Sequence, residues 1–272
     1  MKAEVSFNRE VRPSYFKMGL RSPDLRIGFE PGQFFMVRIG PGIDPLLRRP
    51  FSIHWMEEGY LEILYRIVGK GTKMLASHKI GQEVDILGPL GKGFLIPFDL
   101  ASALLVAGGM GVAPLRALAG RLYSFFQGFG TQAHRADLEA KVVAIIGGKR
   151  SGDILCAEEL QDLGAEVFIT TEDGSLGRKG LATDHLGELL LKSRSCDRPP
   201  SVLYACGPRP MLARVAQVAA FARIPCQVSL EEYMACGIGA CMGCAVESKT
   251  LASPYQMVCR DGPVFDAEAI QW

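Results

Sequence analysis

Short apolar stretches separated by turn residues fill the first hundred positions, and this rhythm predicts β-strands. Proline and glycine pairs mark several of the turns, as at Pro31-Gly32 and Gly88-Pro89. Regularly spaced short strands bounded by such turns are typical of a small antiparallel barrel. We therefore predict a β-barrel domain over residues 1–100. Its strands are expected at residues 4–7, 33–39, 51–55, 60–67 and 83–87.

The pattern changes near residue 101, where apolar runs begin to alternate with stretches of helical periodicity. Such alternation favours a parallel, doubly wound α/β sheet, which we place at residues 101–228. The polar stretch 127–140 has no motif and predicts a surface loop. The strands are expected at 103–107, 142–146, 166–170 and 202–205, and the helices near 114–126, 154–163, 183–191 and 210–223.

Composition limits the classes of function. The chain has 272 residues, 48% of them hydrophobic, which is enough for two compact domains and a small appendage. A net charge of +1 and the absence of a basic run argue against a nucleic-acid partner. The first ten residues carry scattered charges, unlike a signal peptide, and no apolar stretch approaches the ~20 residues of a membrane helix. We expect a soluble, cytoplasmic protein that does not enter a membrane.

Eight cysteines are present, and half of them cluster near the end of the chain. Disulfide frameworks are typical of small secreted domains, which this chain does not resemble. The clustered four follow the spacing C-x4-C-x2-C-x14-C, and its first part is the loop spacing of plant-type [2Fe–2S] sites. Glycines in the loop allow turns that point several thiolates inward. We predict a [2Fe–2S] module over residues 229–272, with the ligands Cys236, Cys241, Cys244 and Cys259.

Structural zinc is the alternative interpretation of the same cysteines. Zinc sites usually pair C-x2-C units or add histidine, and none of the four histidines lies near this cluster. A zinc-stapled nucleotide-binding regulator is therefore the distant alternative. An absorbance spectrum without flavin and iron–sulfur bands would identify it.

An arginine, an aromatic residue and a serine at the start of the predicted strand 51–55 suggest a flavin site. The cation can pair with a pyrophosphate, and the ring can pack against an isoalloxazine. A second aromatic and cation follow on the next strand, and a Gly-Lys-Gly-Thr turn then opens a helix whose amino end favours phosphate. An ordinary strand and turn is the alternative. The candidate flavin residues are Arg49, Pro50, Phe51, Ser52, Leu64, Tyr65, Arg66, Gly71 and Thr72.

Two glycine-containing loops follow predicted strands of the α/β region. Ligands bind at the carboxyl ends of such strands, so the two loops could flank one nicotinamide dinucleotide. The first loop lacks the full G-x-G-x-x-G form, and a single cysteine such as that of the second is usually a buried apolar thiol. The candidate nucleotide residues are Gly108, Gly109, Gly111, Cys206, Gly207 and Pro208.

The residues alone leave NAD and NADP open. Lys149 and Arg150 follow the strand at 142–146, where a 2′-phosphate could be met. No histidine has a spaced carboxylate or serine partner, so we predict no catalytic acid or base on this chain.

In chain order, the motifs RRPFS, LYR, GKGT, GPLGKGF, GGMGVAP and CGP, followed by the cysteine pattern, resemble one family. It comprises the electron transfer subunits of dihydroorotate dehydrogenase B, within the ferredoxin–NAD(P) reductase-like superfamily. The resemblance covers nearly the whole chain, and its most specific parts are RRPFS, GPLGKGF and EEYMACGIGACMGC. It implies that FAD lies against the candidate flavin residues, that the four cysteines hold the cluster, and that the nucleotide is NAD.

The resemblance also implies a partner. A (β/α)8 barrel for dihydroorotate would need about 250 further residues, so the organic substrate is expected on another chain. That chain would be an FMN-containing dihydroorotate dehydrogenase catalytic subunit, joined in a heterotetramer. Electrons would pass from it through [2Fe–2S] and FAD to NAD+, in pyrimidine biosynthesis, because a flavin handles both hydride pairs and single electrons. The rival reading is a reductase subunit of another complex, linked to ferredoxin, sulfide or hydrogen.

Overall fold

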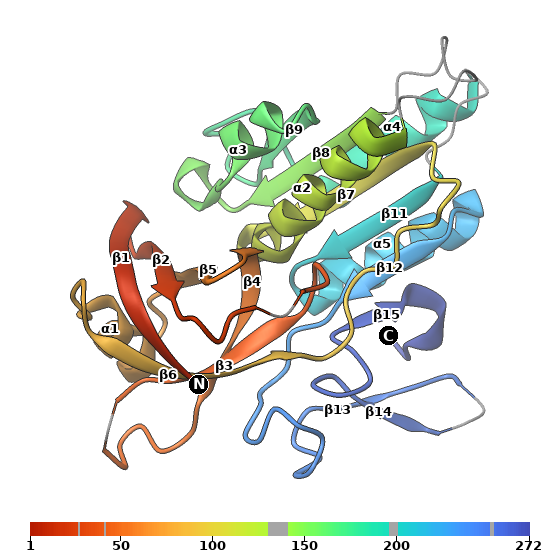
Figure 1. Ribbon diagram of the computed structural model, residues 1–272. Coiled ribbons are helices and arrows are strands. Elements are labelled where there is room, and N and C mark those ends of the chain that lie inside the picture. Colours follow the sequence, from red (N-terminus) through yellow and green to blue (C-terminus); the bar gives the residue numbers. More distant parts are fainter. Residues whose placement is uncertain (27, 41, 130–140, 196–200, 251–252) are drawn as a thin grey trace.

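The computed structural model describes the chain except for residues 27, 41, 130–140, 196–200 and 251–252. A closed β-barrel is followed by a seven-stranded sheet with helices on both faces and by a small C-terminal segment (Figure 1). The predicted fold class is confirmed. Most of the predicted loop at 127–140 lies outside the described residues, and its first three residues belong instead to helix α2 (Val112–Phe129).

The barrel closes through six antiparallel strands in the order β1-β2-β5-β4-β3-β6. Alternate residues of these strands face inward and form a core of their own, in which Val5, Leu20 and Ile63 are fully buried. Helix α1 (Lys70–Ala76) lies between the last two strands in sequence. The strands are β1 (Lys2–Arg12), β2 (Tyr15–Arg21), β3 (Phe34–Arg38), β4 (Arg49–Glu57), β5 (Tyr60–Arg66) and β6 (Glu83–Leu90).

Strand β2 is absent from the sequence prediction. Its sequence YFKMGLR does not alternate, because most of the strand is buried on both sides. Even Lys17 is only 8% exposed, since its stem crosses apolar surface to reach a carboxylate on the next domain. Tertiary contacts, rather than local pattern, therefore make this segment a strand.

The second sheet has the order β10-β9-β8-β7-β11-β12-β15, and its first six strands are parallel. Helices α2 and α3 share a core with one face, and α4 and α5 with the other. Strands covered on both faces read as continuous apolar runs, which is why four of them could be predicted. The elements are β7 (Ser102–Gly108), α2, β8 (Lys141–Gly148), α3 (Ala157–Asp162), β9 (Glu166–Thr171), β10 (Arg178–Lys179), α4 (Ala182–Ser195), β11 (Val202–Cys206), α5 (Arg209–Ala222) and β12 (Cys226–Ser229).

The C-terminal segment adds one strand to this sheet. Strand β15 (Val264–Asp266) pairs antiparallel with β12, so the sheet is mixed at that edge rather than purely parallel as predicted. Three residues are too short to produce a readable pattern. A separate hairpin, β13 (Ala245–Glu247) and β14 (Tyr255–Met257), lies below it in Figure 1.

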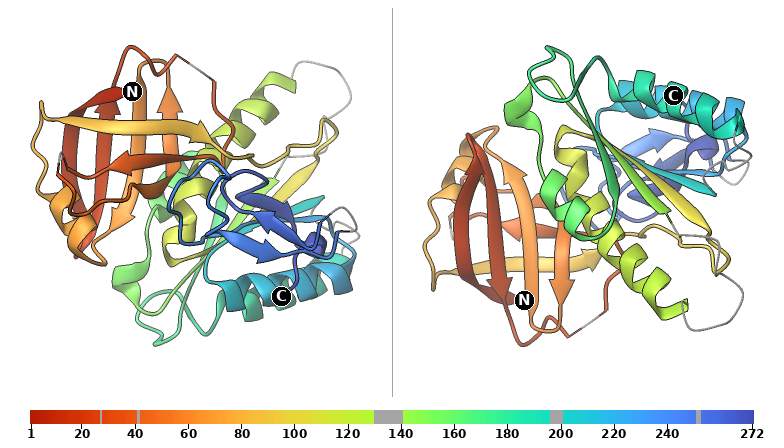
Figure 2. Two further views of the ribbon diagram at one scale, coloured as in Figure 1. Left: turned by 90° about the horizontal axis from the view of Figure 1, so that it is seen from below. Right: turned by 90° about the horizontal axis from the view of Figure 1, so that it is seen from above.

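The segment also touches the barrel. Just beyond β6, the Lys92 amide donates to the Gly262 carbonyl at 2.5 Å. In both views of Figure 2 the same blue C-terminal segment also lies close to the sheet. Among the described residues, no helix combines the length and apolarity needed to cross a bilayer. The domain boundaries at residues 100 and 228 stay predictions.

Candidate cofactor sites

The four clustered cysteines lie in a shell of backbone amides. The amides of Ile238 and Cys241 each donate to the Cys236 sulfur at 3.4 Å, and the Gly239 amide donates to the Cys259 sulfur at 3.1 Å. Cys241 and Cys244 accept one amide each, from Gly243 at 3.5 Å and from Cys259 at 3.4 Å. Amide donors favour the deprotonated thiolate, which is the form that binds metal. The cysteine environment therefore fits an iron–sulfur cluster.

The sulfurs are arranged as two pairs. Cys241 is the side-chain neighbour of Cys236, and Cys244 is that of Cys259. Backbone amides lower the pKa of Cys236 to about 6, whereas burial, followed by the adjacent Cys244, raises that of Cys259 to about 12. Four thiolates around one zinc ion would stand about 3.8 Å apart. No three of these sulfurs, all in described residues, lie within 4.8 Å of one another, which favours two metal ions over one.

Two glycines make the loop possible. Gly237 and Gly239 have φ angles of +73° and +82°, which side chains rarely adopt. A Cβ on Gly237 would also lie 2.5 Å from the Met36 side chain of the barrel. The first part of the loop is thus held against the barrel wall while Cys241 stays exposed at the surface.

Some of the predicted flavin residues lie together at the start of α1. Arg49 packs beside Gly71, where a Cβ would lie 3.5 Å from the arginine Nε. The guanidinium also donates to the Leu47 carbonyl at 2.8 Å, so it is held next to the start of α1. The Thr72 hydroxyl accepts from the amides of Val68 (2.9 Å) and Gly69 (3.2 Å) and thereby fixes the preceding turn. A guanidinium beside a helix start fits a pyrophosphate.

The aromatic residues are placed differently from the prediction. Tyr65 is 2% exposed, its ring packs in the barrel core, and its hydroxyl donates to Asn8 at 2.9 Å. Phe51 and Leu64 are buried as well, while Pro50 and Ser52 are half-buried. Tyr65 and Leu64 can therefore offer a ligand their backbone but no side-chain surface. The exposed member of this group is Arg66, whose guanidinium lies 5.1 Å from the ring centre of Tyr15.

A cavity of about 750 Å³ lies at the carboxyl ends of the parallel strands. It brings together Arg66 from the barrel and both predicted nucleotide loops: Gly108, Gly109, Gly111, Gly207 and Pro208. The loops touch so closely that a Cβ on Gly111 would lie 2.0 Å from the Cys206 carbonyl oxygen. Cys206 itself does not line the cavity. Its thiol is buried, and burial raises its pKa well above the usual value.

Sequence reasoning missed several cavity residues because they come from separate elements. Tyr15 of β2 donates to the Asp153 carboxylate at 2.7 Å, so one hydrogen bond joins barrel and sheet at the cavity wall. Glu231 also lines the cavity, where burial raises its pKa. A carboxylate just beyond β9, Glu172, is the one residue that strand position could have revealed. Of the two cations that follow β8, Lys149 lines the cavity and Arg150 does not.

Behind this cavity, the barrel and sheet are joined by a charged cluster. Glu159 of α3 accepts from Lys17 at 2.7 Å, from His54 Nε2 at 3.3 Å and from Arg116 at 3.3 Å. Cys156 lies near enough that its sulfur, a His54 nitrogen and a Glu159 oxygen fall within 4.8 Å of one another. Two cations already occupy the carboxylate, so a metal ion would have to displace them. We read the cluster as an ion-pair network between domains.

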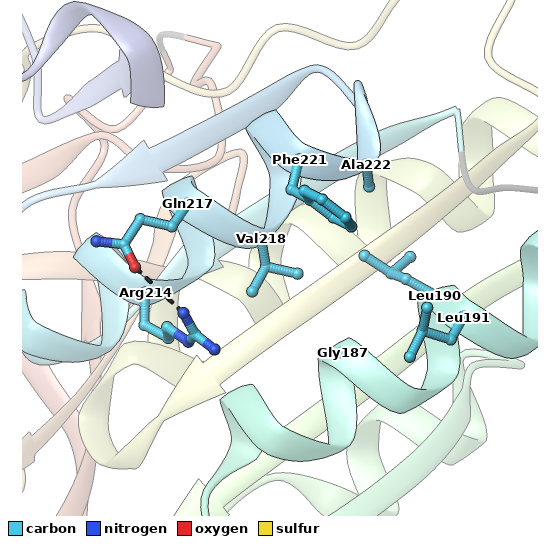
Figure 3. A pocket seen from close by; sticks show the side chains of 8 residues that line it. All are labelled: Gly187, Leu190, Leu191, Arg214, Gln217, Val218, Phe221 and Ala222. Atoms are coloured by element: carbon cyan, nitrogen blue, oxygen red, sulfur yellow. Dashed lines mark hydrogen bonds between the residues drawn. The ribbon is translucent and has the colours of Figure 1, made fainter.

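A smaller hollow of about 410 Å³ lies between α4 and α5 (Figure 3). Its walls are mostly apolar, and Arg214 donates to Gln217 at 3.3 Å on one side. Arg214 also lines the nucleotide cavity, so the two hollows adjoin. The other lining residues are Gly187, Leu190, Leu191, Val218, Phe221 and Ala222.

Comparison with known protein families agrees with this arrangement. Residues 2–94 match the oxidoreductase FAD-binding domain, and residues 105–217 match the oxidoreductase NAD-binding domain. Residues 231–271 match the iron–sulfur cluster binding domain of dihydroorotate dehydrogenase B. The chain is thus an NAD-linked oxidoreductase of the flavin and iron–sulfur class, and its cofactors are FAD, a [2Fe–2S] cluster and NAD.

Individual relatives define the family. The dihydroorotate dehydrogenase B electron transfer subunit of Desulforamulus reducens is 38% identical over 96% of this chain and 94% of its own. The probable electron transfer subunit of Methanopyrus kandleri is 40% identical, covering 99% and 91%. This chain belongs to the family of dihydroorotate dehydrogenase B (NAD(+)) electron transfer subunits, as its motifs predict.

Among solved structures, a chain of an NADH-dependent reduced ferredoxin–NADP oxidoreductase superposes with a TM-score of 0.81. It is 26% identical and covers 99% of this chain and 90% of its own. A ferredoxin reductase of carbazole 1,9a-dioxygenase, at 20% identity over 83% of this chain and 66% of its own, shares the fold with a TM-score of 0.66.

Proposed function

We propose that this chain accepts electrons from an FMN-containing dihydroorotate dehydrogenase catalytic subunit and delivers them to NAD+, as part of a cytoplasmic heterotetramer. The family name implies a catalytic partner, and the relatives' name supplies its substrate. The observation that carries the proposal is the surface position of the cysteine loop. Cys241 is exposed there, and its neighbours Ile238 and Met242 are 57% and 60% exposed. A partner docked on this loop would come within one residue of a cluster ligand.

Residues of this chain divide into three groups, one for each cofactor. Arg49, with Gly71 and Thr72, would hold the pyrophosphate of FAD, and the loops at Gly108 and Gly207 would hold the dinucleotide. The four cysteines would hold the cluster with their amide shell. When bound, the flavin supplies the exchange between hydride pairs and single electrons that neither nicotinamide nor a [2Fe–2S] centre performs alone. The protein's own contribution is to bind, orient and separate these groups.

The cluster assignment is tested with Cys241→Ser. We expect loss of bound iron with FAD retained, because the cysteines lie outside the barrel core. Iron analysis and flavin quantitation measure this. Cys156→Ser is the matched control, since it makes the same atomic exchange outside the loop and should keep the iron. Two irons per chain in the Cys241 variant would remove that residue from the ligand set.

The flavin assignment is tested at two adjacent arginines. Arg49→Ala should weaken FAD binding by about 1.5–3 kcal/mol through loss of a charge-assisted contact. Arg48→Ala is the control, because the Arg48 guanidinium donates to the Asp85 carboxylate at 2.7 Å. FAD titration of both variants compares them. Equal affinities would exclude Arg49 from the site.

The partner is tested by reconstitution. The isolated chain should oxidise NADH with ferricyanide but leave dihydroorotate unchanged, and an FMN-containing dihydroorotate dehydrogenase subunit should restore dihydroorotate-dependent NAD+ reduction. The Cys241 variant should lose this coupled transfer while keeping much of its ferricyanide activity. Dihydroorotate turnover by the isolated chain would refute the division of labour.

A second candidate is supported by the 26% identical ferredoxin-linked structure, which matches nearly the whole length of both chains. In that case this chain would be the reductase subunit of another complex, linked to ferredoxin, sulfide or hydrogen. Co-purification from the native host, with the partner identified by mass spectrometry, separates the two candidates.

A further inference from the structure

The loop after β9 lies against the loop after β8. The Glu172 amide donates to the Gly148 carbonyl at 3.1 Å, and the Asp173 amide donates to the Lys149 carbonyl at 3.2 Å. These bonds place Glu172 beside Lys149, and both residues line the nucleotide cavity. Asp173 is turned to its own loop, where its carboxylate accepts from the Ser175 amide at 2.9 Å and from the Ser175 hydroxyl at 2.6 Å.

The side chains that line this part of the cavity are unfavourable to the 2′-phosphate of NADP. Lys149 is accompanied by two carboxylates that also line the cavity, Glu172 and Asp184. Arg178, on the neighbouring strand β10, is held by the Glu188 carboxylate through both terminal nitrogens, one of them at 2.6 Å, and does not line the cavity. Among the residues that line this part of the cavity, a phosphate dianion would face two carboxylates and one cation.

A neighbouring polar group lacks a partner. Thr170 lines the cavity two residues before Glu172 and is 1% exposed. Its hydroxyl has no hydrogen-bond partner among the described residues. The hydroxyl faces Gly147, on which a Cβ would lie 3.4 Å from the hydroxyl oxygen. A carboxylate accepts two hydrogen bonds from adjacent hydroxyls, and a threonine can donate or accept a third.

Adenosine ribose offers such a pair of hydroxyls. In doubly wound sheets, an acidic residue at a strand end near the glycine-rich loop binds the ribose 2′-hydroxyl of NAD, whereas NADP requires a cation there. We propose that Glu172, with Thr170 behind it, binds the adenosine ribose diol and excludes the 2′-phosphate, so that Glu172 determines the preference for NAD(H) over NADP(H). The inference deepens the nucleotide site of the proposed function and rests on it.

Calorimetric titration with two fragments tests the assignment without electron transfer. ADP-ribose and 2′-phospho-ADP-ribose differ only by the 2′-phosphate on the adenosine ribose. The wild type should bind ADP-ribose at least tenfold more tightly. Glu172→Gln should reduce the ratio of the two dissociation constants about tenfold, chiefly because the phosphorylated fragment binds more tightly. The difference should also shrink at high salt, because exposed charges are screened.

Glu166→Gln is the matched control. It removes the same charge from the amino end of the same strand, about 20 Å away, and should leave the ratio unchanged. In ferricyanide assays, Glu172→Gln should improve NADPH use through KM, with kcat little changed. An unchanged ratio in the Glu172 variant, or an equal change in the Glu166 variant, would overturn the proposal. A wild type that binds neither fragment would refute the nucleotide site itself, and this assignment with it.

Discussion

The sheet that carries the nucleotide cavity packs against the cysteine segment on one side and the β-barrel on the other. The contacts with the cysteine segment are apolar, whereas those with the barrel include a cluster of charged side chains. The cysteine segment shares its core: Val246, Val258 and Ile270 belong to the same buried cluster as Leu203 and Val228 of the sheet. Most buried residues of the barrel form a core of their own, although Phe34 and Met36 join the sheet's cluster. The main helix that the barrel meets is α2, which packs on β4. There, contacts are rich in charge, with Glu159 at their centre.

An apolar contact and a charged contact respond differently to mutation and to pH. A buried, continuous core makes the cysteine segment inseparable from the sheet, so that the position of the cluster ligands is fixed by folding itself. A charged junction depends on protonation and is sensitive to single changes in charge. The junction between the flavin and nucleotide halves should therefore respond to pH through its charged side chains.

The largest effect is expected where the shared core is opened. Ile270 is fully buried, and Ile270→Ala should lower the free energy of unfolding by about 3 kcal/mol through lost burial and a cavity. Chemical denaturation, followed by both tryptophan fluorescence and the visible absorbance of the cluster, measures it. Leu191→Ala, at a side chain that is 64% exposed, is the control and should change stability little. If the cluster absorbance were lost well before the fluorescence signal in the wild type, the two parts would not share one core.

A smaller loss is expected at the charged junction. Glu159→Gln leaves Lys17 and Arg116 close together without their carboxylate, and breaking a buried pair costs 3–5 kcal/mol in general. The Glu159 side chain is 32% exposed, so we expect about 2 kcal/mol, since solvent screens part of the interaction. The same denaturation measurement applies. Glu158→Gln next to it is the control. An undiminished stability would show that the cations find other partners.

The junction should also respond to pH through His54. Burial lowers the pKa of this imidazole, although the Glu159 carboxylate partly opposes the shift. Below the ordinary histidine pKa of about 6.5 the unfolded chain takes up the proton more readily than the folded one, so stability falls as pH decreases. The slope can reach about 1.4 kcal/mol per pH unit from this group. Unfolding free energies between pH 7.5 and 5 should show a shallower slope in His54→Gln, and equal slopes would contradict the assignment.

The smallest effect is expected for the Tyr15–Asp153 hydrogen bond. Tyr15→Phe removes one buried contact, worth about 1 kcal/mol, and leaves the barrel and sheet otherwise joined. Tyr123→Phe, at a residue that is 45% exposed, is the control. Identical stabilities of the Tyr15 variant and the wild type would mean that solvent replaces the bond.

Sequence reasoning succeeded where the signal is local. The cysteine spacing and the two glycine loops are read from consecutive residues. The runs that form β7, β8 and β11 are largely apolar because both faces of the sheet are covered. It failed where tertiary contacts decide. Strand β2 has no alternation, β15 has only three residues, and the ring of Tyr65 turns into the barrel core although its motif suggested a flavin contact.

The cavity residues show the same limit. Tyr15, Asp153 and Glu231 come from three distant parts of the chain and carry no motif of their own. Their meeting depends on the packing of barrel against sheet, which no local pattern encodes. Glu172 is intermediate, because a carboxylate two residues after a predicted strand is visible in the sequence, whereas its position beside Lys149 is not.

The antiparallel pairing of β15 with β12 has a consequence for biosynthesis. Val264 and Phe265 are among the later residues to leave the ribosome, and until they arrive β12 exposes an unpaired edge with the apolar Val228 at its centre. Unpaired edges of this kind recruit strands from other molecules. A nascent chain that stops before this strand should therefore self-associate, and the nucleotide-binding sheet becomes safe from aggregation only when the cysteine segment has been translated.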